Sequence, residues 1–297
     1  MNRLAVVQKR ITRALVSVLV LVLLCPPAWA QSKGLLWKID GPQPSYVFGT
    51  IHLSDPRVTD HPNVFWDAFR KTSTFAMEVV IDSAGLMEMG MAVLAGPQEK
   101  GWEERLSRDE YQKLQQAMQK RGYPPAFIPM LKPWVHAMLI AVPPRQLDSM
   151  QKSLPLDFLL QQRAVSQGKT VVGLEEMGEQ VSVFERMSLP DQIQMLSAMV
   201  RYQENLEGLT EQLIAAYRDR DLAQLGRLMD EGLRMSGADR SYRDRLLLDR
   251  NRRMFERMLP LVQRGNAFIA VGAGHLVGED GLLRLLERRG FRVQSVY

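Results

Sequence analysis

Cysteine is nearly absent from this chain, and histidine is scarce. The single cysteine, Cys25, lies within the first thirty residues, so the remainder of the chain forms no disulfide and offers no thiolate to a metal. The zinc-helix pattern His-Glu-x-x-His does not occur, which counts against a thermolysin-type enzyme. A Gly-x-Ser-x-Gly sequence is also missing, and this makes a serine hydrolase the weaker alternative.

Hydrophobic runs long enough to span a membrane are lacking as well. Residues 1–30 have a basic start, an apolar stretch from Ala14 to Leu24 and a small-x-small site at Ala28-Trp29-Ala30. The apolar stretch is shorter than the roughly 20 residues that a spanning helix needs, and the whole pattern is typical of a secretory signal peptide. We therefore predict cleavage after Ala30, a periplasmic or secreted protein and no stable membrane span afterwards; an uncleaved anchor is the alternative.

A basic excess is missing once the signal peptide is removed. The full chain has a formal net charge of +5. The signal peptide has no acidic side chain and contributes four basic ones, which leaves about +1 for the rest; the four are Arg3, Lys9, Arg10 and Arg13. A nucleic-acid partner is therefore not expected. Residues 31–297 are numerous enough to bury a large core, and we predict that they form a single domain.

Two stretches near opposite ends of the chain have nearly the same pattern. Residues 46–53 and 269–276 each read as a short apolar run followed by Gly-x-x-His-Leu, which brings in His52 and His275. An apolar run that stops at glycine is typical of a buried strand leaving its sheet, and ligands bind at the carboxyl ends of strands in open α/β sheets. We predict that both histidines hold a metal; the alternative is that each is a hydrogen-bonded loop residue.

The other two histidines carry weaker signals. His61 lies in a polar loop, where a solvated side chain is the favoured interpretation and an accessory role near His52 the alternative. His136 lies in an apolar helical stretch and is interpreted as a core or helix-face residue.

A carboxylate interrupts the apolar strand predicted for residues 75–81. An unpaired buried charge is costly, so Glu78 should face a metal, an arginine or a protonated partner. Two histidines and one carboxylate form a recurrent ligand set in zinc and non-haem iron sites. A strand-end glutamate held in an ion pair, or turned to solvent, is the alternative.

The order of predicted elements indicates an α/β fold. A mostly helical section is predicted between about residues 84 and 264, and strands are predicted towards both ends of the chain. The predicted strands are 35–39, 46–51, 75–81, 169–174, 267–271 and 291–296. We expect a central mixed β-sheet built from the N- and C-terminal strands, with a hairpin formed by the first two and the last strand at an edge. Residues near 50 and near 272 would then meet in one sheet.

Three further residues are candidates for the site. Glu175 follows a predicted strand and is expected at the same sheet edge as the histidines, although an acidic residue is also favourable at the start of the next helix. Asn251 lies on the apolar stripe of a predicted helix, and a buried asparagine needs partners. Arg250 beside it could pair with Glu78 or hold a substrate carbonyl or carboxylate.

Taken together and in order, these motifs resemble the TraB/GumN family, the bacterial relatives of the Tiki metalloproteases within the EreA/ChaN-like group of folds. The resemblance spans nearly all of residues 31–297 and rests on six segments: Gly49-Thr50-Ile51-His52, Glu78, Lys132-Pro133-Trp134, Gly168-Lys169 leading to Gly173-Leu174-Glu175, Asp249-Arg250-Asn251, and Val271-Gly272-Ala273-Gly274-His275-Leu276. It implies an α/β fold of the EreA/ChaN type and, for Tiki-like members, a metal-dependent peptidase that uses the two Gly-x-x-His motifs and an acidic residue.

The expected function is that of a periplasmic metal-dependent hydrolase, with peptidase activity as the favoured reaction, acting on a peptide or small-molecule substrate. A divalent ion (Mn, Co, Zn or Fe) would be held by His52, His275 and a carboxylate, and would activate water. Glu78 serves as ligand or as general base; if it is the base, Glu175 or a water completes the shell. Arg250 or Asn251 would stabilise the developing oxyanion. The alternative is a non-catalytic metal-binding, haem-binding or regulatory protein using the same cleft.

Overall fold

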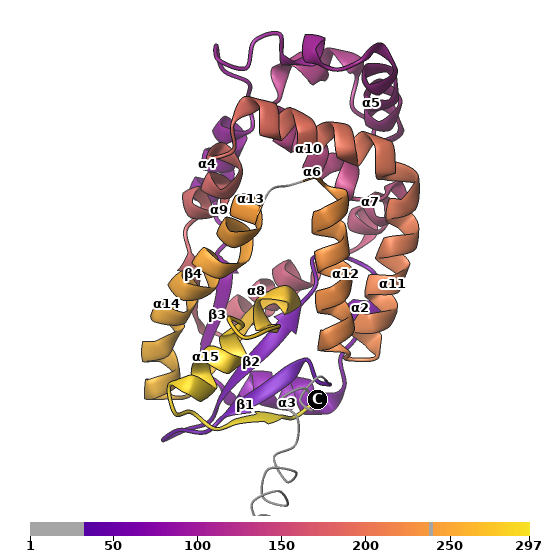
Figure 1. Ribbon diagram of the computed structural model, residues 1–297. Coiled ribbons are helices and arrows are strands. Elements are labelled where there is room, and N and C mark those ends of the chain that lie inside the picture. Colours follow the sequence, from indigo (N-terminus) through magenta and orange to yellow (C-terminus); the bar gives the residue numbers. More distant parts are fainter. Residues whose placement is uncertain (1–32, 238–239) are drawn as a thin grey trace, which may run out of the picture. The chain divides into compact units, whose positions relative to one another are not determined.

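The computed structural model describes residues 33–237 and 240–297, so the signal peptide predicted for residues 1–30 lies outside the described residues. Lys33–Tyr297 form one compact unit, whose elements are labelled in Figure 1. Among the described helices, none combines the length and the apolar character that crossing a membrane requires.

The unit is built on one six-stranded mixed sheet, as predicted. Its strand order is β4-β3-β5-β2-β1-β6. Four neighbouring strands, β4, β3, β5 and β2, run parallel, and β1 pairs antiparallel with both β2 and β6. The bounds are β1 Leu36–Ile39, β2 Ser45–Thr50, β3 Thr74–Val79, β4 Thr170–Glu175, β5 Ala267–Gly272 and β6 Val293–Ser295. The predicted hairpin of the first two strands and the edge position of the last strand are both confirmed.

The register of the central strands carries the main consequence for function. β2 and β5 pair in parallel with Thr50 opposite Gly272, although more than two hundred residues separate them. The loops that follow these two strands therefore leave the sheet side by side. This confirms that residues near 50 and near 272 meet in one sheet.

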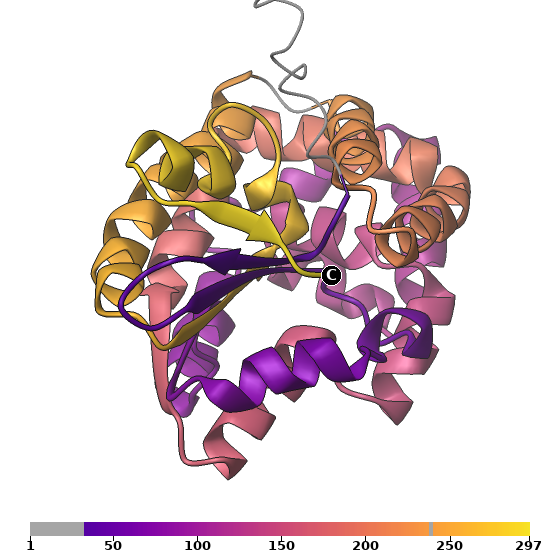
Figure 2. The same cartoon turned by 90° about the horizontal axis from the view of Figure 1, so that it is seen from below.

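Helices cover both faces of the sheet because its central strands are apolar on both sides. Figure 2 shows α3 (Asn63–Lys71) on one face and α14 (Arg250–Arg264) with α15 (Leu282–Arg288) on the other. Helix α8 (Leu156–Ser166) packs against β3 and β4. The core between these layers is aliphatic and aromatic, with Phe48, Phe65 and Phe268 fully buried.

The section between β3 and β5 is mostly helical, as expected. Its remaining helices are α4 Ser83–Ala92, α5 Arg108–Lys120, α6 Pro133–Ala141, α7 Pro144–Lys152, α9 Met177–Glu185, α10 Leu189–Tyr202, α11 Leu206–Arg218 and α12 Leu222–Met235; α2, Pro56–Thr59, precedes them. Several of these helices begin at a clear sequence signal, such as the capping box of Ser107 and Glu110 on α5. A second hydrophobic core joins α5, α6, α9 and α10, whereas the buried residues of α8 and α12 belong to the core of the sheet.

The helix predicted from about residue 241 to 262 contains an irregularity. It runs as α13 (Arg240–Arg243), a π-helical segment η4 (Asp244–Asp249) and then α14. A π-helical turn inserts extra residues into an α-helix, shifts the faces that follow and occurs often at functional sites. Here the segment ends directly before Arg250 and Asn251, and both side chains point into the protein and are buried.

The two remaining histidines are both buried. The solvated position favoured for His61 was wrong: its ring is 6% exposed and packs against Phe48, Phe65 and Trp66. Both of its ring nitrogens are buried without a hydrogen-bond partner among the described residues. The core position expected for His136 is confirmed, since it is fully buried, contacts the ring of Trp102 and has Nε2 3.0 Å from the carbonyl oxygen of Ile128.

Candidate active site

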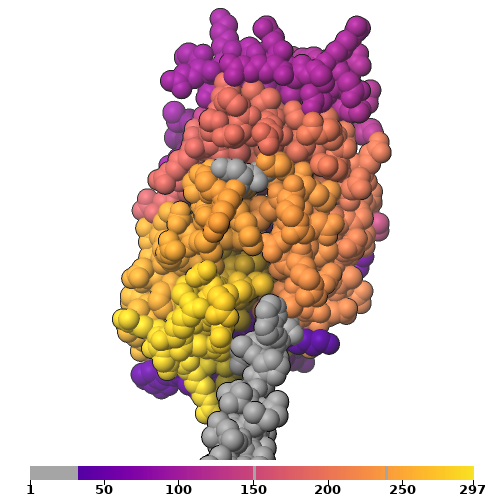
Figure 3. Space-filling view, viewed as in Figure 1, coloured from indigo at the N-terminus to yellow at the C-terminus, as the bar shows by residue number. Residues whose placement is uncertain are grey.

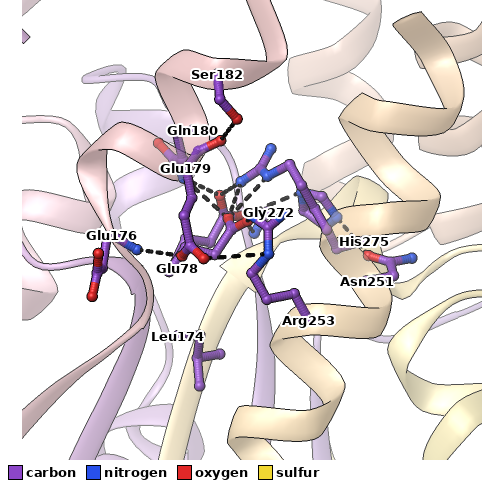
Figure 4. Close-up of polar contacts among 12 residues, drawn as sticks. Glu78, Leu174, Glu176, Glu179, Gln180, Ser182, Asn251, Arg253, Gly272 and His275 are labelled. Carbon is purple, nitrogen blue, oxygen red and sulfur yellow. Dashed lines mark hydrogen bonds and ion pairs between the residues drawn. The ribbon is translucent and has the colours of Figure 1, made fainter. Parts of the chain in front are cut away.

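The two Gly-x-x-His loops and Glu78 converge on Gly272. The backbone N–H of Gly272 donates to Oε1 of Glu78 at 2.6 Å. A Cβ atom added at Gly272 would lie 3.1 Å from that oxygen, 3.6 Å from Cδ2 of His275 and 3.7 Å from Nε2 of His52. The three predicted metal-binding side chains therefore surround one point at the carboxyl end of β5. Figure 4 shows two of them, Glu78 and His275, beside Gly272.

His275 is held in one orientation by Asn251. Nδ1 of His275 lies 2.6 Å from Oδ1 of Asn251, whose Nδ2 donates to the carbonyl oxygen of Asp280 at 2.8 Å. The second bond fixes the amide so that Oδ1 is the acceptor, and Nδ1 of His275 must then carry a proton. Burial lowers the pKa of His275 to about 4, so the ring is neutral near pH 7 and its Nε2 has a free lone pair. That nitrogen lies 3.7 Å from Oε1 of Glu78.

His52 is held in the same manner by a carboxylate. Nδ1 of His52 lies 2.8 Å from Oδ2 of Asp157, and the hydroxyl of Thr50 donates to the other carboxylate oxygen at 2.7 Å. The negative charge of Asp157 raises the pKa of His52 to about 9. The His52 side chain is 67% exposed, whereas those of Glu78 and His275 are 8% and 7% exposed, so His52 is the water-facing member of the group.

Glu78 and Glu175 share one arginine. Nη2 of Arg250 donates to Oε2 of Glu78 at 2.6 Å and to Oε2 of Glu175 at 2.7 Å, and Nε of Arg250 donates to the same Glu175 oxygen at 2.9 Å. Gln180 donates to Oε2 of Glu78 at 3.2 Å. Arg253 contacts the other oxygen of Glu175 at 3.2 Å. The arginine partner expected for Glu78 from the sequence is thus present.

This pairing sets the charge on Glu78. Burial opposes its ionisation, but the neighbouring His275, Arg250 and His52 together with the Gly272 N–H outweigh that effect and lower the pKa of Glu78. Arg250 remains charged at all ordinary pH values, so it keeps Glu78 ionised even where His275 is neutral. The site therefore presents a fixed negative charge next to two imidazole nitrogens.

The donor set suits a divalent metal ion. Each Nδ1 is engaged by a partner, as is usual for metal-binding histidines. Nε2 of His275 has a free lone pair, whereas the raised pKa of His52 keeps a proton on its Nε2 near pH 7, which a binding metal would have to displace. The 3.7 Å between Nε2 of His275 and Oε1 of Glu78 is near the ~3.4 Å expected for two ligands at tetrahedral angles with bonds of about 2.1 Å. Within residues 33–237 and 240–297 as placed, however, no three His, Cys, Asp or Glu side chains are already close enough to hold an ion.

A polar cleft reaches the outer side of this site. It has a volume of about 680 Å³ and lies between α12 and the α13–α14 run, on the face shown in Figure 3. Asn251 and Gly274 form part of its wall, together with Asp230, Arg243 and Asp280. The loop that carries His275 is therefore accessible from this cleft.

All six residues predicted for the site come together: His52, Glu78, Glu175, Arg250, Asn251 and His275. Sequence reasoning missed Asp157 and Gln180. Asp157 is the second residue of α8, where an acidic side chain is ordinary, so its position gave no separate signal. Gln180 lies in the middle of α9, and only the fold shows that it faces Glu78.

Comparison with known proteins places this arrangement in a family. Residues 35–295 match the TraB/PrgY/gumN family. The chain belongs to that family. Proteins similar to this chain include "Metalloprotease TIKI1" of Xenopus tropicalis, 26% identical over 89% of this chain and 62% of that protein, and "Metalloprotease TIKI2" of Danio rerio, 25% identical over 91% of this chain and 62% of that protein.

A shorter relative matches along almost its whole length. The "Uncharacterized protein YbaP" of Shigella flexneri is 22% identical over 87% of this chain and 96% of that protein. The chain spans only about 62% of the length of the two Tiki proteins that it matches. No solved structure matches this member of the TraB/PrgY/gumN family.

Proposed function

We propose that this protein is a metal-dependent peptidase that works in the periplasm, after removal of its signal peptide. The observation that carries the proposal is the convergence of Nε2 of His52, the ring of His275 and Oε1 of Glu78 around Gly272. The metalloprotease names of the Tiki relatives support the same class of chemistry. The sequence-based expectation of a periplasmic location is part of this proposal.

In this scheme His52, His275 and Glu78 hold the ion. A divalent metal in that position supplies Lewis-acid activation of water and of the scissile carbonyl. We assign Glu78 as a ligand and not as the general base, because its two oxygens already accept hydrogen bonds from Gly272, Arg250 and Gln180. Its lowered pKa also makes it a weak proton acceptor near neutral pH.

The remaining side chains position these ligands. Asp157 orients His52 and Asn251 orients His275, so each ring presents Nε2 to the centre. Both ends of the Asn251 amide are occupied, by His275 and by the Asp280 carbonyl, and we therefore assign it to positioning and not to the oxyanion contact expected from the sequence. The side chain of Glu175 is fully buried and forms an ion pair with Arg250. Arg250 holds Glu78 and, as a fixed cation, would stabilise an oxyanion that forms beside it.

The decisive experiment measures metal content and cleavage together. Protein stripped with a chelator is reloaded with Mn²⁺, Co²⁺, Zn²⁺ or Fe²⁺, and bound metal is counted by mass spectrometry while a library of quenched fluorescent peptides reports hydrolysis. We expect about one ion per chain and metal-dependent cleavage in the wild type, and loss of both in His52→Ala and His275→Ala.

His61→Phe is the matched control, because it removes a buried histidine that packs among aromatic rings. It should keep the metal and the activity. Equal metal content and equal cleavage in the wild type and in both alanine variants would rule out the site.

A further inference from the structure

A second cavity lies in the helical section, next to the polar cleft, and Leu233 lines both. It is enclosed by α6, α10, α11 and α12, with Tyr242 of α13 at one side, and has a volume of about 220 Å³. Four methionines line it: Met138, Met195, Met199 and Met235. Most of its other lining residues are aliphatic, among them Leu206, Leu209 and Leu213. Met138 and Tyr202 are 45% and 43% exposed, so the cavity has an open mouth.

Two hydroxyls in its wall, those of Thr210 and Ser236, are turned back to the backbone. The hydroxyl of Thr210 donates to the carbonyl oxygen of Leu206, and that of Ser236 donates to the carbonyl oxygen of Leu233, both at 2.8 Å. The surface offered to a ligand is therefore mainly hydrocarbon and sulfur. A ligand recognised here is apolar.

The size of the cavity suits one side chain. An apolar cavity of about 150 Å³ accepts benzene, whereas pockets for drug-sized ligands begin near 300 Å³. A cavity of 220 Å³ lies between these limits and fits one aromatic or long aliphatic group. Methionine walls adapt to different shapes and make favourable contacts with aromatic rings.

The cavity is connected to the candidate active site by one helical run. Tyr242 contributes to the cavity wall, and Arg250 follows eight residues later along the run from α13 to α14. Eight residues of helix rise at most about 12 Å, because the π-helical segment η4 within this run is more compact than an α-helix. This length corresponds to no more than three or four residues of an extended peptide.

We propose that this cavity is a side-chain subsite that selects peptides with an aromatic or large aliphatic residue three or four positions from the scissile bond. The subsite rests on the proposed peptidase function. It adds the class of substrate that the site prefers.

Gly232 offers a way to fill the cavity without disturbing the fold. It lies inside α12 and lines the cavity, and a Cβ atom there would meet only Cδ2 of Leu209, at an ordinary 3.7 Å. Replacing a glycine inside a helix also favours the helix. Gly232→Leu should therefore fold and occupy the cavity. Gly208→Leu is the matched control, because Gly208 is exposed on α11 and a Cβ atom there meets nothing within 4 Å.

In the first measurement, indole is added to the metal-free protein, and its binding is detected by NMR as shifts of the ¹³C-methyl signals of the methionines. Met199→Leu assigns one of the cavity signals. We expect indole to shift the signals of the four cavity methionines in the wild type and in Gly208→Leu, and to leave them unshifted in Gly232→Leu. Unshifted cavity methionines in the wild type would overturn the proposal.

The second measurement compares peptides that differ only by Phe or Ala at the selected position, using metal-loaded protein. We expect the wild type and Gly208→Leu to favour the Phe peptide by about 10- to 100-fold in kcat/KM, and Gly232→Leu to lose this preference while still cleaving the Ala peptide. The same preference in Gly232→Leu would overturn the subsite. Indole binding at the four methionines without cleavage of any peptide by the wild type would instead overturn the peptidase function and leave an apolar ligand site of another kind.

Discussion

Protonation of His61 is expected to destabilise the protein in mild acid, and its replacement by phenylalanine should remove that effect. The ring is packed among aromatic side chains, and neither of its nitrogens has a hydrogen-bond partner among the described residues. Burial lowers the pKa of His61 to about 4 in the folded protein, against 6.5 for the free side chain. The unfolded chain therefore binds a proton at His61 more readily than the folded protein does.

The sign and size of the change in stability follow from the difference between the folded and unfolded pKa values of His61. Since the folded pKa is lower than the unfolded one, the full stability is present above about pH 6.5 and is lost as the pH falls towards 4. One pKa unit corresponds to about 1.4 kcal/mol, so the loss due to His61 is about 2 kcal/mol at pH 5 and about 3 kcal/mol at pH 4. The effect levels off below pH 4.

Urea unfolding of the wild type and of His61→Phe, followed by circular dichroism between pH 4 and 8, measures the effect. The free-energy difference between the two proteins should be constant above pH 7 and should shift by about 3 kcal/mol in favour of the variant at pH 4. Taking the difference cancels other titrating groups, including the buried His136. A difference that stays constant across the whole range would show that His61 is not buried in its neutral form.

Three other variants test the site. Gly272→Ala should fold, because the φ of −52° and ψ of 135° at this position suit alanine. It should lower the metal affinity measured by calorimetry at least about tenfold, because the new methyl group enters the centre between the three ligands. Unchanged affinity would place the ion elsewhere. Asp157→Asn should weaken metal binding about 10- to 100-fold with little change in melting temperature, and affinity equal to the wild type would show that this carboxylate does not orient His52. Glu175→Gln should cost about 3 kcal/mol in urea unfolding, since Arg250 loses a charged partner in a buried position; a loss below about 1 kcal/mol would contradict the importance of that pair.

The sequence predicted the sheet and most of the site because both depend on short-range patterns. Apolar runs ending at glycine located β2 and β5, and the charge inside an apolar strand identified Glu78. The repeated Gly-x-x-His pattern then indicated two loops at one sheet edge. Their parallel pairing, Thr50 opposite Gly272, is the structural reason that the prediction of their meeting was correct.

Other features depend on tertiary contacts that no local pattern encodes. The loop position of His61, next to Asp60, made the ring look solvated, whereas Phe65 of α3 and Tyr297 pack against it. The π-helical segment before Arg250 also lacks a sequence signal.

The place of β5 in the sheet has a consequence for synthesis of the chain. This strand lies between β3 and β2, yet it is the fifth of six strands to emerge. Until residues 267–272 are available, the sheet exists only as two halves, each with an unpaired inner edge, and such edges invite association with other chains. A nascent or C-terminally truncated protein therefore has neither a closed sheet nor a second histidine loop, and we expect it to need protection by chaperones until its last thirty residues arrive.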